Sequence, residues 1–421
     1  MKIQRLDIKN FRGIRDMRID FHPQLNVFAG NNGIGKTTIL KALDKTIDAA
    51  RLNHVTGNER RDLESFAIIS PHDIQTGAEH ALISLQFSFK DKQICTNVSS
   101  KPEDMTSDLI TLFPEAGLRL PHRTFSEDRS TITGTYTPDD QIRNMISGVD
   151  PIIGSIINDT TRFGYAFTWI SEREDLENNR LRKFIDSGKE FGKDHFEKDK
   201  TLQIIKSAIV DVTGFDGLFY DRERPGFTLR KSIGSEEETL LFSQLSSGEQ
   251  HLVAIVTAIA VYLAVSFPEL ENPLHGEAVF MIDAIELHLH PSWQRGIIPR
   301  LTKSFPGCQF IMTTHSPQIL GNIRPDSVFI LKRMDHDIVY EKPDESYGMT
   351  MDRLLELVMD DNARSAVSIS KYLEKLFDYI SRKEFDQACD LAKSLKKEIP
   401  TDPDLIRAEM LLHKFLRGED F

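Results

Sequence analysis

The sequence predicts an α/β protein with a mixed central sheet, an antiparallel β lobe, a helical insertion and a C-terminal helical tail. Three observations carry this prediction. Short alternating runs fill residues 1–29, as in antiparallel strands. After Thr239, continuous apolar runs alternate with helical patterns, which is typical of a parallel sheet covered on both faces. Beyond Tyr347 every pattern is helical, so we expect a head over 1–345 and a helical region over 346–421.

The individual elements follow from the spacing of apolar residues. The expected strands are Leu25–Ala29, Ala81–Phe89, Gln93–Val98, Ala278–Asp283, Gln309–Thr313 and Ser327–Leu331. The expected helices are Thr37–Ala49, Gln141–Ile146, Leu176–Ser187, Lys200–Val212, Leu252–Phe267, one after Pro291, Ala366–Ser381, Glu384–Ile399 and Asp402–Leu416. The β lobe and the insertion should lie at about 50–240, and the last three helices resemble either a tetratricopeptide-type array or a cap.

Composition narrows the class of protein. The chain of 421 residues is 40% apolar and 28% charged, as in soluble globular proteins. Its net charge of -12 argues against non-specific attraction to phosphate backbones, although a local basic patch stays open. Three widely separated cysteines fit reduced thiols, and the charged N-terminal stretch lacks a signal-peptide pattern, so we expect a cytoplasmic protein. The apolar run Leu252–Phe267 predicts a helix buried on all sides rather than a membrane span.

Residues 30–37, GNNGIGKT, fit the phosphate-loop (Walker A) pattern between a predicted strand and a predicted helix. Glycines allow backbone amides to wrap phosphates, Lys36 would neutralise the β/γ oxygens, and Thr37 would ligate Mg²⁺. A chance glycine turn is the alternative. The candidate nucleotide-binding residues of this loop are Gly30, Asn31, Asn32, Gly33, Gly35, Lys36, Thr37 and Thr38.

Three further motifs follow in chain order. LSSGEQ at 245–250 is by itself an ordinary helix start, but after a phosphate loop it resembles the signature loop of ABC-type ATPases, which contacts the ATP of another protomer. Asp283 ends a buried strand and is the second metal candidate, and His315 ends another strand, where this class has a histidine that senses the γ-phosphate. The candidate signature residues are Ser246, Ser247, Gly248 and Glu249.

Two histidines after Asp283 also need an interpretation. His288 and His290 in LHLHP could meet one metal ion on an extended strand, but the sequence offers no third ligand nearby. We therefore favour a dimer-contact loop over a metal site.

Together, LDIKNFRGI, GNNGIGKTT, LSSGEQ, MIDAIELHLHP and TTHSP resemble the SMC/RecF-like ABC ATPases of the OLD and Septu defence group, over roughly residues 1–335. SYG at 346–348 and the helical tail are similar to the PtuA-type ATPase of Septu antiphage systems. The resemblance implies an ABC-type ATPase head, ATP and Mg²⁺ as ligands, a dimer or an assembly of dimers, and an HNH nuclease partner of the PtuB type. Contact with DNA stays open, and no membrane is implied.

The resemblance also implies roles for single residues. Arg12, in NFRG, should reach the bound phosphates, while Asn32 and Gly33 should wrap the β-phosphate. The Gln-loop residue of the family is not identified, and Gln86 is only a candidate for it.

Position 284 departs from the family pattern, because family members carry Asp-Glu where this chain has Asp283-Ala284. The glutamate activates water, which a methyl group cannot do. Glu286 lies beyond the strand end, and we do not expect it to replace the lost base. Ala284 and His315 are thus the catalytic positions of a chain that should bind ATP but hydrolyse it poorly. We favour a deliberate Glu→Ala replacement over a naturally degenerate ATPase.

The function implied is that of an ATPase subunit of an antiphage complex, which controls a nuclease through nucleotide-dependent dimer closure. The alternative is a RecF-like DNA-repair ATPase. Long SMC arms would need heptads that the sequence does not sustain, and the helical tail lacks the strand-borne acidic cluster of an OLD-type nuclease.

Overall fold

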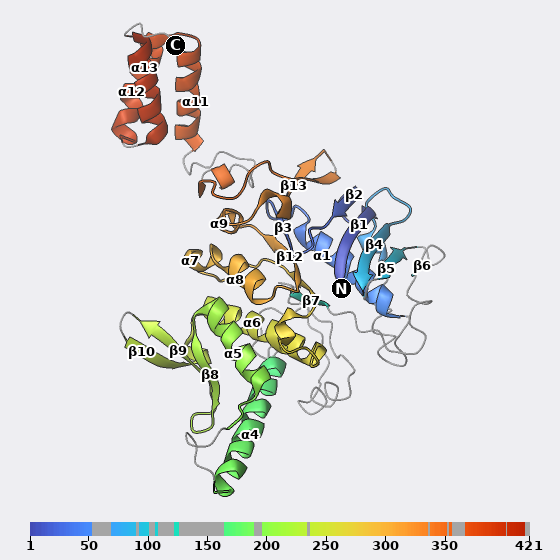
Figure 1. Cartoon of the computed structure of the whole chain (residues 1–421). Helices are drawn as coiled ribbons and strands as arrows, with labels where there is room; N and C mark the ends of the chain where they lie inside the picture. Colours follow the sequence, from blue (N-terminus) through green and yellow to red (C-terminus); the bar gives the residue numbers. More distant parts are fainter. Residues whose placement is uncertain are drawn as a thin grey trace. The chain divides into compact units, whose positions relative to one another are not determined.

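The structure, a computed structural model, describes residues 1–52, 69–89, 92–100, 106–107, 122–125, 164–188, 196–233, 236–335, 337–351, 353–355, 367–400 and 402–416. Contacts divide the chain into two compact units, Met1–Met349 and Thr350–Phe421 (Figure 1). The predicted helix Gln141–Ile146 lies outside the described residues.

The first unit begins with an antiparallel sheet of five strands in the order β2-β1-β4-β5-β6. Its strands are β1 (Lys2–Phe11), β2 (Ile14–Asp20), β4 (Leu82–Phe89), β5 (Lys92–Ser99) and β6 (Thr106–Ser107). In β1 and β4 apolar residues alternate with polar ones, so one face of this sheet is buried and the other is partly exposed.

The central sheet has six strands in the order β14-β13-β3-β12-β11-β7. Its strands are β3 (Leu25–Ala29), β7 (His122–Phe125), β11 (Val279–Ile282), β12 (Gln309–Thr314), β13 (Val328–Met334) and β14 (Asp337–Glu341). All neighbours are parallel except β13 and β14, which form a hairpin. The sheet is therefore mixed, and the predicted α/β fold class with an antiparallel lobe and a helical tail is confirmed.

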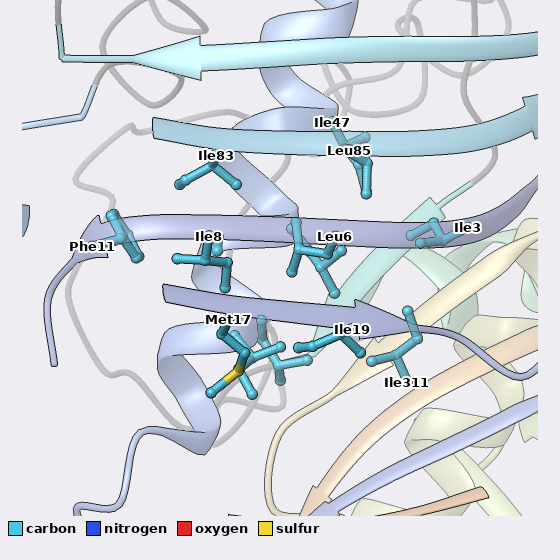
Figure 2. Close-up of a cluster of buried hydrophobic side chains, with 14 of the residues drawn as sticks. Ile3, Leu6, Ile8, Phe11, Met17, Ile19, Ile47, Ile83, Leu85 and Ile311 are labelled. Atoms are coloured by element: carbon cyan, nitrogen blue, oxygen red, sulfur yellow. The ribbon is translucent and has the colours of Figure 1, made fainter. Parts of the chain in front are cut away.

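The first unit also contains the helices α1 (Lys36–Leu52), α6 (Ser247–Ser266), α7 (Pro291–Gln294), α8 (Ile297–Ser304) and α9 (Pro317–Leu320). Its short 3-10 turns are η1 (Pro71–Asp73), η4 (Phe242–Gln244), η5 (Pro273–His275) and η6 (Pro325–Ser327). Helix α1 shares one apolar core with both sheets. Figure 2 shows this core, with Leu6 and Ile8 of β1, Ile83 of β4, Ile47 of α1 and Ile311 of β12 converging. The core fixes the start of α1 relative to the central sheet.

A third, three-stranded antiparallel sheet and two helices belong to the helical insertion and the stretch that follows it. They are α4 (Gly164–Asp186), α5 (Lys200–Thr213), β8 (Asp216–Asp221), β9 (Gly226–Ile233) and β10 (Glu236–Leu241). The sequence did not predict this sheet, and it placed the start of α4 too late. Helix α4 begins earlier because its first turns bury Phe167 and Ile170, the former against Phe227 of β9 and Phe242.

Helix α6 is the predicted apolar helix, and its burial on all sides is confirmed: from His251 to Ala264 only Ala258 and Tyr262 are not fully buried. Of the helices in the described ranges, α6 alone is long and apolar enough to cross a membrane, yet 72% of its apolar window is buried inside the protein. We therefore interpret it as a core helix.

The second unit contains α11 (Val367–Ser381), α12 (Phe385–Glu398) and α13 (Pro403–Leu416), close to the bounds that the sequence predicts. The three helices share an apolar core that includes Leu376 and Leu405.

Candidate active site

The predicted phosphate loop joins β3 to α1. Its backbone has φ of 147° at Gly30 and 73° at Gly33, conformations that residues with a Cβ rarely adopt. A Cβ on Gly30 would lie 2.8 Å from the carbonyl oxygen of Leu331 in β13. A Cβ on Gly33 would meet no described atom within 4 Å. The loop is thus tight against the sheet at its start and open at its centre, directly before the N-terminus of α1.

Lys36 lies inside this loop and is only 5% exposed. Its Nζ donates hydrogen bonds to the carbonyl oxygens of Gly30 (2.8 Å) and Asn31 (2.9 Å). It also lies 2.8 Å from Nδ1 of His315. Because an ammonium group can only donate, Nδ1 accepts in this contact. The predicted cation of the phosphate loop and the predicted sensor histidine therefore touch, although they come from opposite ends of the first unit's sequence.

Asp283 follows β11 at the edge of the sheet where β3 and β12 also end, since Ile282 is in register with Met312 and Ala29 with Thr314. This carboxylate is 4% exposed. Its Oδ2 accepts a hydrogen bond of 2.8 Å from Oγ1 of Thr37. The two predicted metal ligands are thus adjacent.

The chemistry of this oxygen pair fits Mg²⁺. Magnesium prefers hard oxygen ligands and usually takes one or two from the protein, with water and phosphate oxygens for the rest. The hydroxyl of Thr37 and the carboxylate of Asp283 supply such a pair. Within the described ranges no group of three His, Cys, Asp or Glu side chains could hold a metal ion, so a Mg²⁺ ion here would depend on water and nucleotide for its other ligands.

Thr313, which the sequence analysis did not single out, holds this arrangement from β12. Its Oγ1 donates to Oδ1 of Asp283 and accepts from the backbone N–H of Ala284 at 2.8 Å. The residue is fully buried. Its only sequence signal was a hydroxyl next to the end of the strand that leads to His315.

Replacing Thr313 with valine is expected to destabilise the fold by about 2 kcal/mol, because Asp283 and the N–H of Ala284 would lose a buried partner. Chemical denaturation would measure the change in the free energy of unfolding. Thr257→Val is the matched control, since Thr257 is equally buried but its Oγ1 only donates to Val253 O within α6. The control should lose less than about 1 kcal/mol, and equal losses would contradict a special role for Thr313.

The turn after Asp283 holds positions 284 and 286. Ala284 is 5% exposed and adopts φ of 50°, and its carbonyl accepts from the N–H of Leu287 at 2.9 Å. Glu286 points its Oε1 at the backbone N–H of His315, which donates to it at 2.6 Å. The turn therefore connects to the sensor histidine through Glu286.

The predicted signature residues stand at the N-terminus of α6. Ser246 caps the helix: its Oγ accepts from the N–H of Glu249 at 3.4 Å, while Oε2 of Glu249 accepts from the N–H and Oγ of Ser246, both at 2.9 Å. Lys231 of β9 donates to Oε1 of Glu249 at 2.6 Å. Burial would raise the pKa of Glu249, but the hydrogen bonds from Lys231 and Ser246 outweigh it and hold the pKa below its usual value. Ser247, beside them, is exposed.

Gly248 brings α6 against the loop that carries His288. A Cβ on Gly248 would lie 2.0 Å from the carbonyl oxygen of His288 and 3.4 Å from Cα of Leu289. Only glycine permits this approach of two backbones. The helix start and the turn after Asp283 are therefore packed as one body.

Each of the two histidines of LHLHP has its own contact. The imidazole of His288 lies edge-on to that of His251 in α6, with ring centroids 6.5 Å apart. His290 caps α7, and its Nδ1 accepts from the N–H of Ser292 at 3.3 Å. His251 is 7% exposed, and its Nε2 has no hydrogen-bond partner among the described residues. Burial, and secondarily the charge of His288, lowers the pKa of His251 to about 4.

The depressed pKa of His251 predicts a loss of stability in mild acid. The unfolded chain takes up a proton at a pKa of about 6.5 and the folded chain only near 4, so the free energy of unfolding should fall by about 2 kcal/mol from pH 7 to pH 5 through this residue. Denaturation curves at both pH values would test this. His251→Leu should remove that part of the slope, whereas His275→Gln, at an exposed histidine, should leave it unchanged.

Arg12 lies in the β1–β2 hairpin, where its backbone has φ of 54°. Its Nε donates to Oδ1 of Asp73 at 2.8 Å, and its N–H donates to the carbonyl of Asp73 at 2.7 Å. Burial would raise the pKa of Asp73, but Arg12 and the nearby Lys45 lower it overall. The hairpin arginine is thus held by a buried carboxylate that the sequence analysis did not identify. Gln86 lies in β4, in register with Arg5.

The structure therefore brings together the phosphate loop, Asp283 and His315. Arg12 instead contacts Asp73, and Glu249 of the predicted signature contacts Lys231. A glycine-rich loop before a helix, a buried lysine in that loop and the pair formed by the Thr37 hydroxyl and the Asp283 carboxylate are typical of P-loop ATPases. The chain belongs to the family described as "AAA domain, putative AbiEii toxin, Type IV TA system", which matches residues 25–321.

Individual relatives agree with this class. The chain is 24% identical to the "Retron Ec83 probable ATPase" of Escherichia coli, over 100% of this chain and 88% of that one. It is 25% identical to the "Septu protein PtuA" of Bacillus thuringiensis, over 88% of both chains. The predicted resemblance to PtuA-type ATPases is confirmed. Among solved structures, an Smc head bound to the C-winged helix domain of ScpA aligns with a TM-score of 0.46 and 15% identity, over 82% of this chain and 98% of that one.

Proposed function

We propose that this chain is the ATP-binding subunit of an antiphage defence complex, in which nucleotide-dependent dimer closure controls an HNH nuclease. Two contacts carry the ATP part of the proposal: Lys36 with His315, and Thr37 with Asp283. The similarity to a protein named Septu protein PtuA supports the defence part.

Each residue of the site has a proposed role. The open loop around Gly33 wraps the phosphates with its amides, and Lys36 exchanges its carbonyl partners for β/γ-phosphate oxygens. Thr37 and Asp283 would hold Mg²⁺, which would neutralise phosphate charge. His315 then senses the γ-phosphate from its position beside Lys36. Arg12 gives its Nε–H to Asp73, and its remaining guanidinium N–H groups would contact the phosphates.

Dimer closure would use the exposed start of α6. Ser246 and Ser247 are exposed at a helix N-terminus, which is suited to an anion. Two protomers would clamp ATP between the phosphate loop of one and the signature residues of the other, so that nucleotide occupancy changes the subunit arrangement. We further propose that the head spans 1–345, and that the insertion within 50–240 and the helical region 346–421 carry partner-binding surfaces in the cytoplasm.

Hydrolysis would be impaired because Ala284 cannot activate water. The chain would therefore bind Mg²⁺ and ATP, close, and reopen slowly. A deliberate replacement of glutamate at this position fits such a trapped state.

Light scattering during gel filtration tests the proposed ATP-dependent dimer. The chain should be dimeric or larger with Mg²⁺ and ATP and smaller with ADP. Lys36→Ala and Ser246→Arg chains should each fail to associate with ATP. A mixture of the two should associate, because a mixed dimer has one complete site. Association of either variant alone, to the extent of the parent chain, would contradict the clamp.

Purification of the tagged chain from its own cells tests the partner. An HNH protein in the complex at a fixed ratio, retained in high salt, is the expected result. Salt-sensitive DNA without such a protein would instead support the RecF-like repair function.

A further inference from the structure

Glu286 has one carboxylate oxygen whose role the proposed site leaves unexplained. Its Oε1 accepts a hydrogen bond of 2.6 Å from the backbone N–H of His315. Its Oε2 is buried and has no hydrogen-bond partner in the described part of the chain. The other acidic residue of this turn, Asp283, has partners for both of its oxygens, Thr37 and Thr313.

A buried carboxylate oxygen without a partner is costly, because the charge has lost its water and gained no donor in exchange. In folded proteins such an oxygen usually binds an ordered water or an ion. The contacts of Glu286 place it next to the phosphate loop. Its Oε1 binds the backbone N–H of His315, and Nδ1 of the same histidine lies 2.8 Å from Nζ of Lys36, the cation of that loop.

We propose, on the basis of the ATP site above, that Glu286 is a positioning residue of that site. Its Oε1 fixes the backbone of His315, so that the imidazole stays beside Lys36. Its Oε2 accepts a hydrogen bond from the water that lies next to the γ-phosphate. Because residue 284 is alanine, Glu286 would order this water without replacing the lost base, and phosphate release would stay slow.

Two substitutions separate the two oxygens' roles. Glu286→Gln keeps a carbonyl acceptor for the N–H of His315 but removes the negative charge. Glu286→Ala removes both. Glu271→Gln is the matched control, because Glu271 is an exposed glutamate that undergoes the same loss of charge away from the site.

The first measurement needs no nucleotide. Amide hydrogen exchange of His315 should accelerate by about tenfold in Glu286→Ala, which is the lower limit expected for the loss of a hydrogen bond to a charged acceptor. In Glu286→Gln it should accelerate by less than about threefold. Unchanged exchange in Glu286→Ala would overturn the role of Oε1. If that variant does not fold, Glu286→Met, which keeps the side-chain length without an oxygen acceptor, takes its place: a rise of about tenfold in exchange supports the contact, and unchanged exchange overturns it.

The second measurement is single-turnover phosphate release from labelled ATP, with ATP affinity measured in parallel. Glu286→Gln should release phosphate about tenfold more slowly than the parent, with ATP affinity within about threefold, since the charge that orders the water is lost. Glu271→Gln should match the parent. A parental rate in Glu286→Gln would overturn the role of Oε2. Failure of the parent itself to bind ATP would refute the proposed function instead, and the exchange measurement would still decide the contact with His315.

Discussion

An Ala284→Glu variant is expected to release phosphate from ATP about 10²–10⁴-fold faster than this chain, the range that a positioned general base contributes. The other proposed residues of the site already lie close together, because Lys36 contacts His315 and Thr37 contacts Asp283. A carboxylate at 284 would directly follow the metal-type aspartate. A malachite-green assay under saturating ATP would measure the rate.

The backbone should accept this change without rearrangement. Residue 284 already has φ of 50° with a Cβ, so glutamate meets the same backbone cost as alanine. Its N–H is held by Thr313 and its carbonyl by Leu287. Ala284→Gln is the matched control, because it has the same size without the charge, and it should stay near the parental rate. Unchanged turnover in Ala284→Glu, with ATP still bound, would contradict the assignment of the missing base.

A Gly248→Ala variant is expected to lose about 3 kcal/mol of stability and its ATP-dependent association. Alanine normally stabilises a helix by about 0.5–1 kcal/mol over glycine. Here its Cβ would lie 2.0 Å from a backbone oxygen of His288, which cannot rotate away, so overpacking should dominate. Thermal unfolding measures the first effect and light scattering with ATP the second.

Gly296→Ala provides the comparison for this substitution. Gly296 precedes α8 with φ of -106°, and its Cβ would meet only the side chain of Arg300 at 3.5 Å, an ordinary contact. This control should change stability by less than about 1 kcal/mol. A Gly248→Ala protein as stable as the Gly296→Ala protein would show that α6 can move away from the loop that carries His288 with little loss of stability.

The sequence predicted those parts of the site whose chemistry depends on consecutive residues. The phosphate loop is such a case, since glycines, Lys36 and Thr37 must follow one another between a strand and a helix. Asp283 and His315 were singled out because each follows a predicted strand in the order of motifs that ABC-type ATPases have, and parallel strands bring such ends together.

The remaining residues could not be predicted because their roles arise from contacts between distant segments. Asp73 meets Arg12 across 61 positions, and Thr313 meets Asp283 across 30. Lys231 lies in the sheet β8–β10, whose strands carry so many charged residues that their alternation is masked, as in EEETLL of β10. A single sequence carries no signal for such pairs.

The hydroxyl of Ser246 donates a hydrogen bond to the carboxylate of Glu249, and Lys231 of β9 donates to the same carboxylate. In the proposed dimer, this hydroxyl would have to turn from Glu249 to the γ-phosphate of the opposite protomer. Closure would then be an exchange of one charged acceptor for another, with a net gain of only about 1 kcal/mol for this contact. The contact of Ser246 with the γ-phosphate would therefore be lost as soon as the γ-phosphate leaves. The strength of the ion pair between Lys231 and Glu249 would then influence the rate at which the dimer dissociates.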